Sequence, residues 1–577
     1  MKVSDYIVSF LKEQGIRVVF GYIGGMITHL VDSIDKAEGI SYIQTYHEQT
    51  AAIGAEGYAR ETNNFGVAIS TSGPGITNMI TGIADAFLDS VPTLFISGQV
   101  NTNEYKYDKP IRQQGFQELD VVELCSSITK YACLVDDAKN IRYELEKAIS
   151  IAKQPRKGPV VLDIPMNIQR QEIEPCSLKG YKEEEKKEES YDIDKVIEKI
   201  SRAKRPIIVV GSGIRDNAKD KLEELLNQNE VAVVCSLLGK GQVRESHKLF
   251  LGLLGSYGLR MANIAVAKSD LIIALGSRLD VRQTGAKLDE FEGKDIIQVD
   301  IDRNELENHR LKGRLTINCL VEDFIEKLIS NKESLFNSDK KWVNFLLYLK
   351  ENYSQQKEVE RFVENKMPYR AMDIINRYSK EGDAISVDIG QNQMWAAQSI
   401  VLKNHQTFTT SGGLAPMGFS LPCAIGISFA NPSKRVFAIL GDGAMMISEQ
   451  SLYIISQYNL PITILLLNNT SLGMITQFQS LYFNSNMAAT TIKGGYKAAD
   501  MEKLSLSHGL SHHIIEEKDM LNAEYLNNVF NNHNGVVEFK IEGLTTVSPK
   551  LEFDQPIFNP TPHLPKEELN HIFSLLE

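Results

Sequence analysis

The chain has 577 residues, which is too long for a single ordinary hydrophobic core and predicts two to four domains. Hydrophobic residues make up 43% of the sequence and charged residues 24%, a balance that excludes a disordered or fibrous protein. The net charge of −12 argues against a general nucleic-acid-binding surface, although it leaves room for a small pocket that binds a phosphate.

The beginning of the chain predicts a helix and not a signal peptide, because residues 1–15 place charges among apolar positions at helical spacing. No stretch approaches the roughly 18 uninterrupted apolar residues of a membrane span, and the longest candidates, such as 462–467, have the length of a strand. We therefore expect a cytoplasmic protein without a membrane partner. The six cysteines show no CxxC spacing, which predicts reduced, buried thiols with a structural role.

The first third of the chain alternates short apolar runs, such as 67–69 and 93–96, with helical patterns. Each run ends in a turn that contains glycine, which is typical of a doubly wound α/β domain. A run of charged residues follows at 182–189, KEEEKKEE, which is either a binding tail or, more often, a solvated linker or helix face. We place a boundary there, so that the first domain covers residues 1–178.

The α/β pattern then restarts twice. A middle domain is expected over residues 191–331 and a third domain over residues 368–545, with a polar helical segment between them. Their strand candidates are the apolar runs 206–210, 231–234, 271–275, 296–299, 384–387, 436–440 and 462–467. Five prolines interrupt the remaining residues, so 546–577 should form an arm laid over the body or over a partner. The predicted fold class is α/β, with three doubly wound parallel-sheet domains and a C-terminal tail.

Polar residues follow two strands of the third domain. Asp442 lies between Gly441 and Gly443 where the chain leaves one strand, and a helix should begin near Ala444. Asn469 follows the next strand, so both side chains should meet at one edge of the sheet. A carboxylate, an amide oxygen and a loop carbonyl, for which we expect Ser471, form with diphosphate oxygens and water the oxygen shell that Mg²⁺ prefers.

The sequence from Gly441 to Asn469, GDGAMMISEQSLYIISQYNLPITILLLNN, resembles the thiamine diphosphate-binding motif, and its continuation SLGMITQFQSLYF is similar to acetolactate synthases. Other stretches match that family in its order, up to about residue 545: GYIGGM (21–26), YHEQTAAIGAEGYAR (46–60), STSGPGITNMITGIADAF (70–87), QGFQELD (114–120), ALGSRLDVRQTG (274–285), GQNQMWAAQ (390–398) and SGGLAPMGFSLPCAIG (411–426).

The resemblance implies how the cofactor is held. The first domain would bind its pyrimidine and the third its diphosphate, through Gly390, Gln391, Asn392, Met417, Gly441, Asp442, Gly443, Ala444, Asn469, Leu472, Gly473 and Met474. Asp442, Asn469 and Ser471 would hold Mg²⁺. Met417 matches the large side chain that bends the cofactor in this family.

Glu48 matches the family's activating acid, which hydrogen-bonds N1′ of the aminopyrimidine and so lets the 4′-nitrogen deprotonate the thiazolium ring. We expect an apolar neighbourhood around it. In this family the activating acid and the metal site of one active centre come from two chains, so the resemblance implies a homodimer or homotetramer with the active site at the interface.

Several turns of the middle domain suit a dinucleotide, since they fall at strand ends. A lone GSG at 211–213 is weak support, because the full GxGxxG is absent. Their joint similarity to the flavin-binding stretches of acetolactate synthases implies FAD, in a structural role without redox turnover, through Gly211, Gly255, Gly276, Arg278 and Asp300.

The resemblance implies loss of CO₂ from a 2-keto acid, for which we expect pyruvate, and carboligation to a carbonyl acceptor. Phe116 and Gln117 would line the catalytic pocket, and Gly25, Met26, Arg282 and Phe478 would contact substrate. Six positions depart from the family pattern: Met26, Met166, Val281, Asn392, Ala415 and Phe478.

These departures leave the acceptor open. Pyruvate and 2-ketobutyrate are candidates, and so is a nucleotide-activated ketosugar. A 2-keto acid decarboxylase, an oxidase that uses the flavin and a catalytically silent regulatory relative also stay open. The decarboxylases carry a paired His in the first domain, which the segment 113–117 lacks, whereas His512 and His513 lie in the third domain and are expected to be surface or structural residues.

Overall fold

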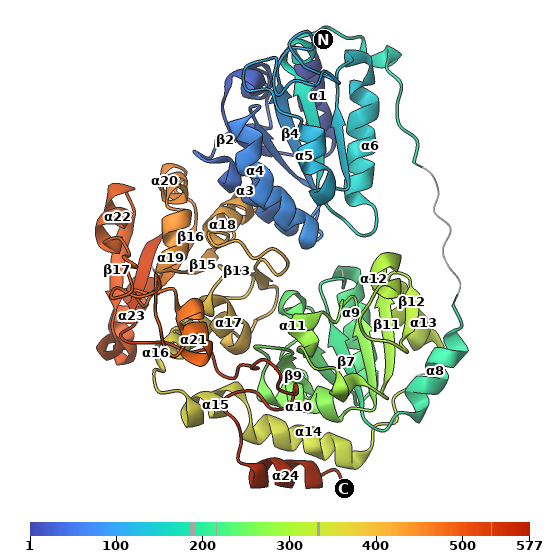
Figure 1. Cartoon of the computed structure of the whole chain (residues 1–577), viewed down its shortest axis with the longest axis vertical. Coiled ribbons are helices and arrows are strands. Elements are labelled where there is room, and N and C mark those ends of the chain that lie inside the picture. Colours follow the sequence, from blue (N-terminus) through green and yellow to red (C-terminus); the bar gives the residue numbers. More distant parts are fainter. Residues whose placement is uncertain (184–190, 215, 332–334, 532–533) are drawn as a thin grey trace.

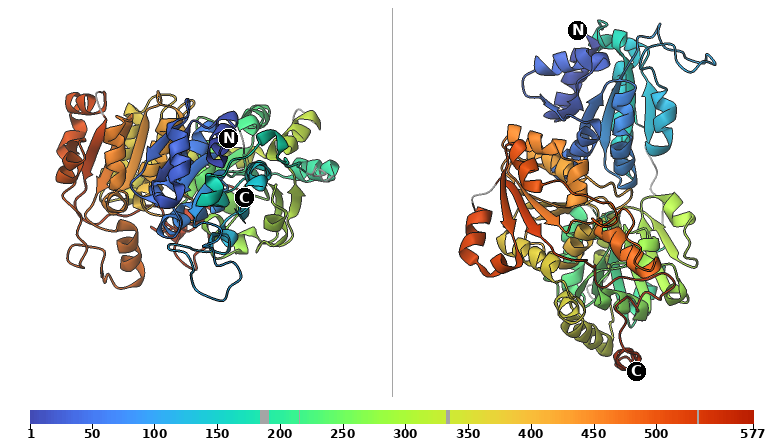
Figure 2. Two further views of the ribbon diagram at one scale, coloured as in Figure 1. Left: turned by 90° about the horizontal axis from the view of Figure 1, so that it is seen from above. Right: turned by 60° about the vertical axis from the view of Figure 1, so that its left-hand side comes forward.

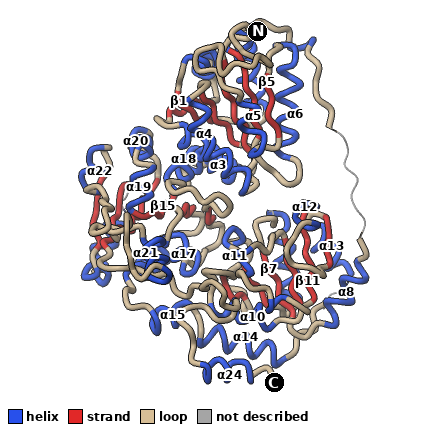
Figure 3. Tube along the Cα trace, in the orientation of Figure 1, coloured by secondary structure: helices blue, strands red, loops and turns tan. Residues whose placement is uncertain are grey.

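The computed structural model describes residues 1–183, 191–214, 216–331, 335–531 and 534–577, in which three six-stranded parallel sheets follow one another along the chain (Figures 1 and 3). The first sheet contains β1 (Val18–Tyr22), β2 (Ser41–Gln44), β3 (Gly66–Ser70), β4 (Thr93–Gln99), β5 (Tyr131–Leu134) and β6 (Val160–Pro165). The second contains β7 (Pro206–Val210), β8 (Ala232–Cys235), β9 (Phe250–Leu253), β10 (Leu271–Leu275), β11 (Asp295–Asp300) and β12 (Leu315–Asn318). The third contains β13 (Ala384–Val387), β14 (Thr407–Thr409), β15 (Val436–Gly441), β16 (Ile462–Asn468), β17 (Ser511–Ile515) and β18 (Gly535–Lys540).

Helices cover the sheets, which confirms the predicted α/β fold class. The first sheet is accompanied by α1 (Val3–Glu13), α2 (Thr28–Asp35), α3 (Glu48–Thr62), α4 (Pro74–Leu88), α5 (Val121–Cys125), α6 (Ile141–Lys153) and α7 (Met166–Gln169). The second is accompanied by α8 (Ile193–Arg202), α9 (Asp216–Gln228), α10 (Arg260–Lys268), α11 (Val281–Thr284), α12 (Arg303–Glu307) and α13 (Val321–Asn331). Two further helices, α14 (Lys340–Asn352) and α15 (Gln355–Phe362), connect the second domain to the third. The third is accompanied by α16 (Met367–Tyr378), α17 (Gln391–Ser399), α18 (Ser420–Ala430), α19 (Asp442–Ile447), α20 (Gln450–Gln457), α21 (Gly473–Tyr482), α22 (Met501–Ser507) and α23 (Ala523–Asn531).

The first and third sheets share one topology. Their strands are ordered β2-β1-β3-β4-β6-β5 and β14-β13-β15-β16-β18-β17, which is the same sequence of connections. In both sheets the chain changes direction between the first and third strands, at β1/β3 and at β13/β15. Ligands of open parallel sheets bind outside the carboxyl ends of the strands at such a switch point. Each of the two sheets therefore offers one candidate edge.

Two glycine-bearing helices, α3 and α18, join the first domain to the third. A Cβ at Gly57 would lie 2.3 Å from the backbone oxygen of Cys423, and a Cβ at Gly426 would lie 2.0 Å from that of Gly54. The helix backbones thus touch where no side chain fits. Along most of its length α18 is buried and apolar, as expected of a helix enclosed by protein. The first domain lies at one end of the molecule, with the other two at the opposite end (Figures 1 and 2).

Three carboxyl groups strengthen the same junction. Glu56, Asp85 and Asp89 offer oxygens within 4.8 Å of one another, and Arg60 pairs with Glu56 at 2.5 Å and with Asp89 at 2.9 Å. The Ser411 hydroxyl donates to Asp85 at 2.5 Å from the third domain. Burial raises the pKa of both Glu56 and Asp85. Because Arg60 already occupies the cluster, we assign it a structural role.

The C-terminal arm runs over the second and third domains and ends in α24 (Lys566–Ser574) beside α14 (Figure 1). The guanidinium group of Arg260 makes two hydrogen bonds to the carboxylate of Glu358, at 2.8 and 2.9 Å. It also donates to the backbone oxygens of Pro560 and Pro562 at 3.2 and 2.7 Å. This buried group therefore fixes the course of the arm, which lies over the body of its own chain.

Within the described ranges, no helix is long and apolar enough to cross a membrane. The charged run 182–189 falls mainly on 184–190, outside the described residues. The expectation of buried thiols is confirmed for Cys125, Cys235 and Cys423, whereas Cys133 and Cys319 are only half-buried. It is wrong for Cys176, which is exposed because it lies in a surface turn beyond α7.

Candidate active site

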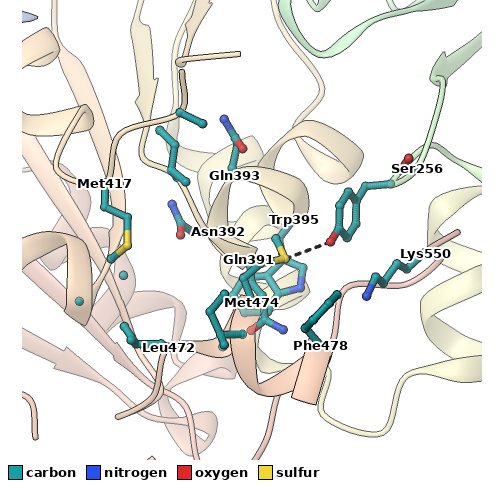
Figure 4. A pocket seen from close by; sticks show the side chains of 18 of the residues that line it. Ser256, Gln391, Asn392, Gln393, Trp395, Met417, Leu472, Met474, Phe478 and Lys550 are labelled. Carbon is teal, nitrogen blue, oxygen red and sulfur yellow. Dashed lines mark hydrogen bonds between the residues drawn. The ribbon is translucent and has the colours of Figure 1, made fainter. Parts of the chain in front are cut away.

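A cavity of about 560 Å³ opens at the carboxyl edge of the third sheet (Figure 4). Its walls come from three turns that follow β13, β15 and β16, from α11 and the loop after β9 in the middle domain, and from the C-terminal arm. Seventeen of the residues singled out from the sequence line it: Gly390, Gln391, Asn392, Ala415, Met417, Gly441, Asp442, Gly443, Ala444, Asn469, Ser471, Leu472, Gly473, Met474, Val281, Arg282 and Phe478. Two of these turns meet at the switch point of the sheet.

Asp442 is the first residue of α19, directly after β15, as the sequence predicts. The connection to β16 contains two helices instead of the single one expected, because the chain turns at Ser448. The side chain of Asp442 is buried and accepts a hydrogen bond of 2.8 Å from the hydroxyl group of Tyr496. Burial raises the pKa of Asp442 to about 6. A divalent cation at this position would offset that cost.

Asn469 follows β16 and faces the same edge. Its amide nitrogen donates to the Thr545 hydroxyl at 2.9 Å, which leaves its oxygen oriented toward the turn, where it accepts from the backbone N–H of Ser471 at 3.2 Å. Ser471 is buried, and its hydroxyl oxygen has no hydrogen-bond partner among the described residues. The edge thus gathers oxygen donors of the kind that Mg²⁺ binds.

Glycines open space at this edge. A Cβ at Gly473 would lie 2.1 Å from the side-chain oxygen of Gln391 and 2.8 Å from the side-chain nitrogen of Asn469. A Cβ at Gly443 would lie 2.7 Å from Leu472 and 3.2 Å from Met417. Side chains at these two positions would fill the floor of the cavity. Together with the oxygen donors, this cradle fits a metal-bound diphosphate.

Hydrogen bonds hold the remaining wall residues. The amide group of Gln391 donates to Gln477 at 3.1 Å and to the backbone of Thr545 at 2.8 Å. Met417 contributes from the loop before α18, and Met474 from α21 (Figure 4). The sulfur of Met474 accepts a 3.2 Å hydrogen bond from the hydroxyl of Tyr257. The cavity is therefore lined by residues of a single chain.

Five predicted residues lie elsewhere, in the first domain. Glu48 begins α3, is only 6% exposed and accepts a 2.9 Å hydrogen bond from Asn78. A Cβ on Gly75, at the start of α4, would lie 3.4 Å from its carboxylate. The neighbourhood is therefore enclosed, with a polar donor, rather than purely apolar.

The other four are grouped at the same edge of the first sheet. The backbone N–H of Met26, next to Gly25, donates to Thr71 at 3.3 Å, and a Cβ at Gly73 would lie 3.0 Å from the backbone oxygen of Gln117. Phe116 is 81% exposed. None of these five residues lines the cavity of the third sheet. The predicted site residues of one chain thus form two separate groups, one at the carboxyl edge of each of these two sheets, and we call each group a half-site.

A second cavity, of about 520 Å³, lies between the middle domain and the other two. Gly211, Gly276, Arg278 and Asp300 line it, whereas Gly255 stands just behind its wall. Gly255 has a φ of +116°, and a Cβ there would lie 2.1 Å from the backbone oxygen of Arg282. The glycine turns and an acidic side chain at the end of β11 have the chemistry that a dinucleotide requires.

Two functional candidates at or beside the first cavity were missed from the sequence. Tyr496, which contacts Asp442, lies in a loop with no motif, so only the folded chain reveals it. Lys550 lines the cavity from the arm, and no motif in the surrounding sequence TTVSPKLEFD marks it. His512, expected at the surface or in a structural role, is buried at 3.0 Å from Glu538 and is structural.

Comparison with known proteins agrees with this geometry. The models of the thiamine pyrophosphate enzymes match the chain three times: the N-terminal TPP binding domain over residues 1–124, the central domain over 193–328 and the C-terminal TPP binding domain over 388–538. The chain is 35% identical over 530 residues to the acetolactate synthase isozyme 2 large subunit of Escherichia coli, covering 91% of this chain and 92% of that one. It is 34% identical over 521 residues to the acetolactate synthase large subunit of Lactococcus lactis, covering 88% and 87%. It is 36% identical over 499 residues to the chloroplastic acetolactate synthase of Arabidopsis thaliana, covering 85% and 73%.

Proposed function

Because the chain belongs to the thiamine pyrophosphate enzymes of the acetolactate synthase type, we propose that it decarboxylates pyruvate and joins the two-carbon unit to a carbonyl acceptor. Thiamine diphosphate, another name for the pyrophosphate, supplies the nucleophilic carbon and the electron sink for this chemistry when it is bound. The observation that carries the proposal is the cavity at the β13/β15 switch point, where a buried carboxylate, amide oxygens and open glycine turns meet.

Three residues hold the metal and the diphosphate in this proposal. Asp442 and Asn469 bind Mg²⁺ through their side-chain oxygens, and Ser471 binds it through its backbone oxygen. The support is their position on one edge, the burial of Asp442 and the space left by Gly443 and Gly473. Met417 fills the space beside Gly443 and limits how the cofactor can lie.

Glu48 activates the cofactor of a partner subunit in this proposal. Its carboxyl group accepts a hydrogen bond from Asn78 through one oxygen, Oε2, so Oε1 is free to share a proton with N1′ of the pyrimidine. Within one chain Glu48 does not border the cavity of Asp442, which leaves each half-site incomplete alone. The exposed ring of Phe116 beside the first half-site suits an interface. We therefore expect a homodimer, or a homotetramer built from dimers.

FAD is the proposed occupant of the second cavity. Its support is the set of strand-end turns and the 520 Å³ volume, which open between all three domains. The expected role is structural. Flavin released from the heat-denatured protein, measured by fluorescence, tests this assignment. A cytoplasmic location remains a prediction from the sequence.

The overall reaction balances simply. The bond between the carboxylate and the keto carbon of pyruvate breaks, CO₂ leaves, and a carbon–carbon bond forms to the acceptor carbonyl carbon. The acceptor oxygen gains one proton, so each turnover consumes one proton from solution. The matching relatives are acetolactate synthases, which does not favour a simple decarboxylase, an oxidase or a silent relative.

The test is to incubate the purified protein with Mg²⁺, thiamine diphosphate and ¹³C-labelled pyruvate, and to measure CO₂ and products by mass spectrometry. Labelled CO₂ together with an acetohydroxy acid is the expected result. Free aldehyde as the main product would contradict carboligation, and absence of CO₂ would contradict the proposed activity altogether.

A further inference from the structure

The acceptor end of the first cavity contains a buried cation whose role the cofactor does not explain. Lys550 is 7% exposed and lines the cavity from the C-terminal arm. Among the described residues its ammonium group makes no hydrogen bond or ion pair, and its neighbours are the rings of Phe478 and Tyr482, at 5.8 and 5.6 Å from the ring centres. Lysine is rarely buried without a partner, because an ammonium ion loses its hydration there.

The arm is fixed at this point, so the position of Lys550 is built into the fold. Leu551 donates a 2.7 Å backbone hydrogen bond to Ser256 of the middle domain, and Phe553 donates a 3.1 Å bond to the hydroxyl of Tyr482 on α21. Lys550 itself exchanges two backbone hydrogen bonds with Thr561, at 2.9 and 2.7 Å. The arm thus places one ammonium group in the wall of the cavity.

A second cation, Arg282 on α11, borders the same cavity. Its guanidinium carbon lies 5.8 Å from the ring centre of Tyr257, the neighbour of the Ser256 that holds the arm. Two carboxylates also line the cavity: Asp442, at the metal edge, and Glu552, which is hydrogen-bonded to Thr561. Figure 4 shows Lys550 beside Phe478, on the side of the cavity away from Met417 and Asn392. The acceptor end therefore contains two cations, Lys550 and Arg282, and one carboxylate, which is already hydrogen-bonded to Thr561.

We propose that Lys550 and Arg282 together bind the anionic part of the acceptor, and that they select a carbonyl compound with two negative charges over pyruvate. This inference rests on the proposed function, since it concerns the second substrate of that reaction. Two charges are expected because two cations face one carboxylate that is already hydrogen-bonded, so a dianion balances the charge of this end of the cavity better than a monoanion does. A phosphate ester and a dicarboxylate share this chemistry, and the test below separates them.

Burial lowers the pKa of Lys550, and Glu552 opposes that effect. A phosphate or carboxylate beside the ammonium group would favour its charged form and would form a charge-assisted hydrogen bond. The flanking aromatic rings exclude water and strengthen that interaction. A neutral acceptor would leave the cation unpaired.

The experiment measures kcat/KM for four acceptors with labelled pyruvate as donor: glycolaldehyde, glyoxylate, glycolaldehyde phosphate and oxaloacetate. We expect the wild-type protein to prefer an acceptor with two charges over glycolaldehyde by about tenfold or more. Preference for the phosphate alone identifies a phosphate ester, and preference for oxaloacetate identifies a dicarboxylate. Equal values for charged and neutral acceptors in the wild type, or a value for the monoanion glyoxylate as high as that for the better dianion, would overturn the proposal without any variant.

The variants then assign the preference to Lys550. In Lys550→Met the ratio of kcat/KM for the preferred dianion to that for glycolaldehyde should fall about tenfold, and Lys550→Arg should recover most of it. Lys566→Met is the matched control, since Lys566 is exposed on the same arm and lies outside the cavity. An equal fall for all four acceptors in Lys550→Met, or no rescue by Lys550→Arg, would show that Lys550 only supports the arm. A wild-type protein that releases no CO₂ from pyruvate would instead contradict the proposed function.

Discussion

Glu48 and Asp442 stand at the carboxyl edges of two sheets with the same strand order, yet the two residues of one chain do not border the same cavity. Glu48 begins α3 and Asp442 begins α19, and the contact of α3 with α18 fixes the two domains in place. The backbones of these two helices touch, and in this arrangement Glu48 stays outside the cavity of its own chain. An interface with a second copy is therefore the direct way to unite the two residues.

Glu48→Gln should slow CO₂ release by several orders of magnitude, because an amide cannot share a proton with N1′ as a carboxyl group does. The side chain keeps its size and can still accept the hydrogen bond from Asn78. Single-turnover CO₂ release with saturating cofactor is the measurement. Glu38→Gln, an exposed change on the same domain, should have no effect. Unchanged CO₂ release in Glu48→Gln would contradict the role given to this residue.

Metal removal should abolish activity, and added Mg²⁺ should restore it. In Asp442→Asn the Mg²⁺ concentration that gives half of the maximal activity should rise by about tenfold or more, because the metal loses its one anionic protein ligand. Titration of activity with Mg²⁺ after treatment with a chelator provides the measurement. Glu502→Gln, on the exposed face of α22, is the control. An unaltered Mg²⁺ requirement in Asp442→Asn would place the metal elsewhere.

Tyr496→Phe removes the hydroxyl group that donates to Asp442 at 2.8 Å. Partners of metal ligands orient them, and their loss typically weakens metal binding by about tenfold. We expect the Mg²⁺ titration to shift in that direction while the melting temperature changes little. Tighter binding of Mg²⁺ by Tyr496→Phe would mean that the hydroxyl group competes with the metal instead of supporting its ligand.

The burial of Asp163 predicts how the stability of the folded protein changes with pH. It is fully buried on β6, accepts a 2.8 Å hydrogen bond from Gln99 and has one oxygen without a partner. Burial raises its pKa from 3.8 to about 8. Since the folded pKa exceeds the unfolded one, its contribution to stability is fully present below pH 4 and is lost as the pH rises toward 8.

Asp163→Asn should remove this dependence while keeping an oxygen for Gln99. The difference in unfolding free energy between the variant and the wild type should grow in favour of the variant as the pH rises from 5 to 8, by up to about 1.4 kcal/mol per pH unit. Urea unfolding at each pH measures it. A constant difference across this range would show that Asp163 is ionised throughout.

The sequence predicts the elements that are enclosed on both faces. The runs 206–210 and 271–275 coincide with β7 and β10, and 436–440 and 462–467 each fall one residue short of β15 and β16. Central parallel strands are covered by helices on both sides and so read as uninterrupted apolar runs. Edge strands are less apparent, as β17 (SHHII) illustrates, because half of their surface does not need apolar residues.

The residues of the candidate site also fall into some that the sequence predicts and some that it misses. Asp442 and Asn469 are readable because each directly follows a strand, and adjacent parallel strands end at one edge. Tyr496 contacts Asp442 from a loop and Lys550 lines the cavity from the arm, and neither segment has a periodic pattern, so their positions depend on tertiary contacts. The separation of Glu48 from the cavity of its own chain also needs the assembled domains.

Mixing two inactive variants tests the central claim most directly. Glu48→Gln and Asp442→Asn subunits are unfolded together, refolded and assayed for CO₂ release from pyruvate at a Mg²⁺ concentration that sustains the wild type but is too low for Asp442→Asn to be active. If each active site takes Glu48 from one chain and Asp442 from the other, every mixed dimer contains one intact site. Random pairing makes half of the dimers mixed, and one of the two sites in each is intact, so the mixture should recover about one quarter of wild-type activity. Recovery of no activity, while a wild-type sample refolded in parallel regains its own, would contradict an active site shared between two chains.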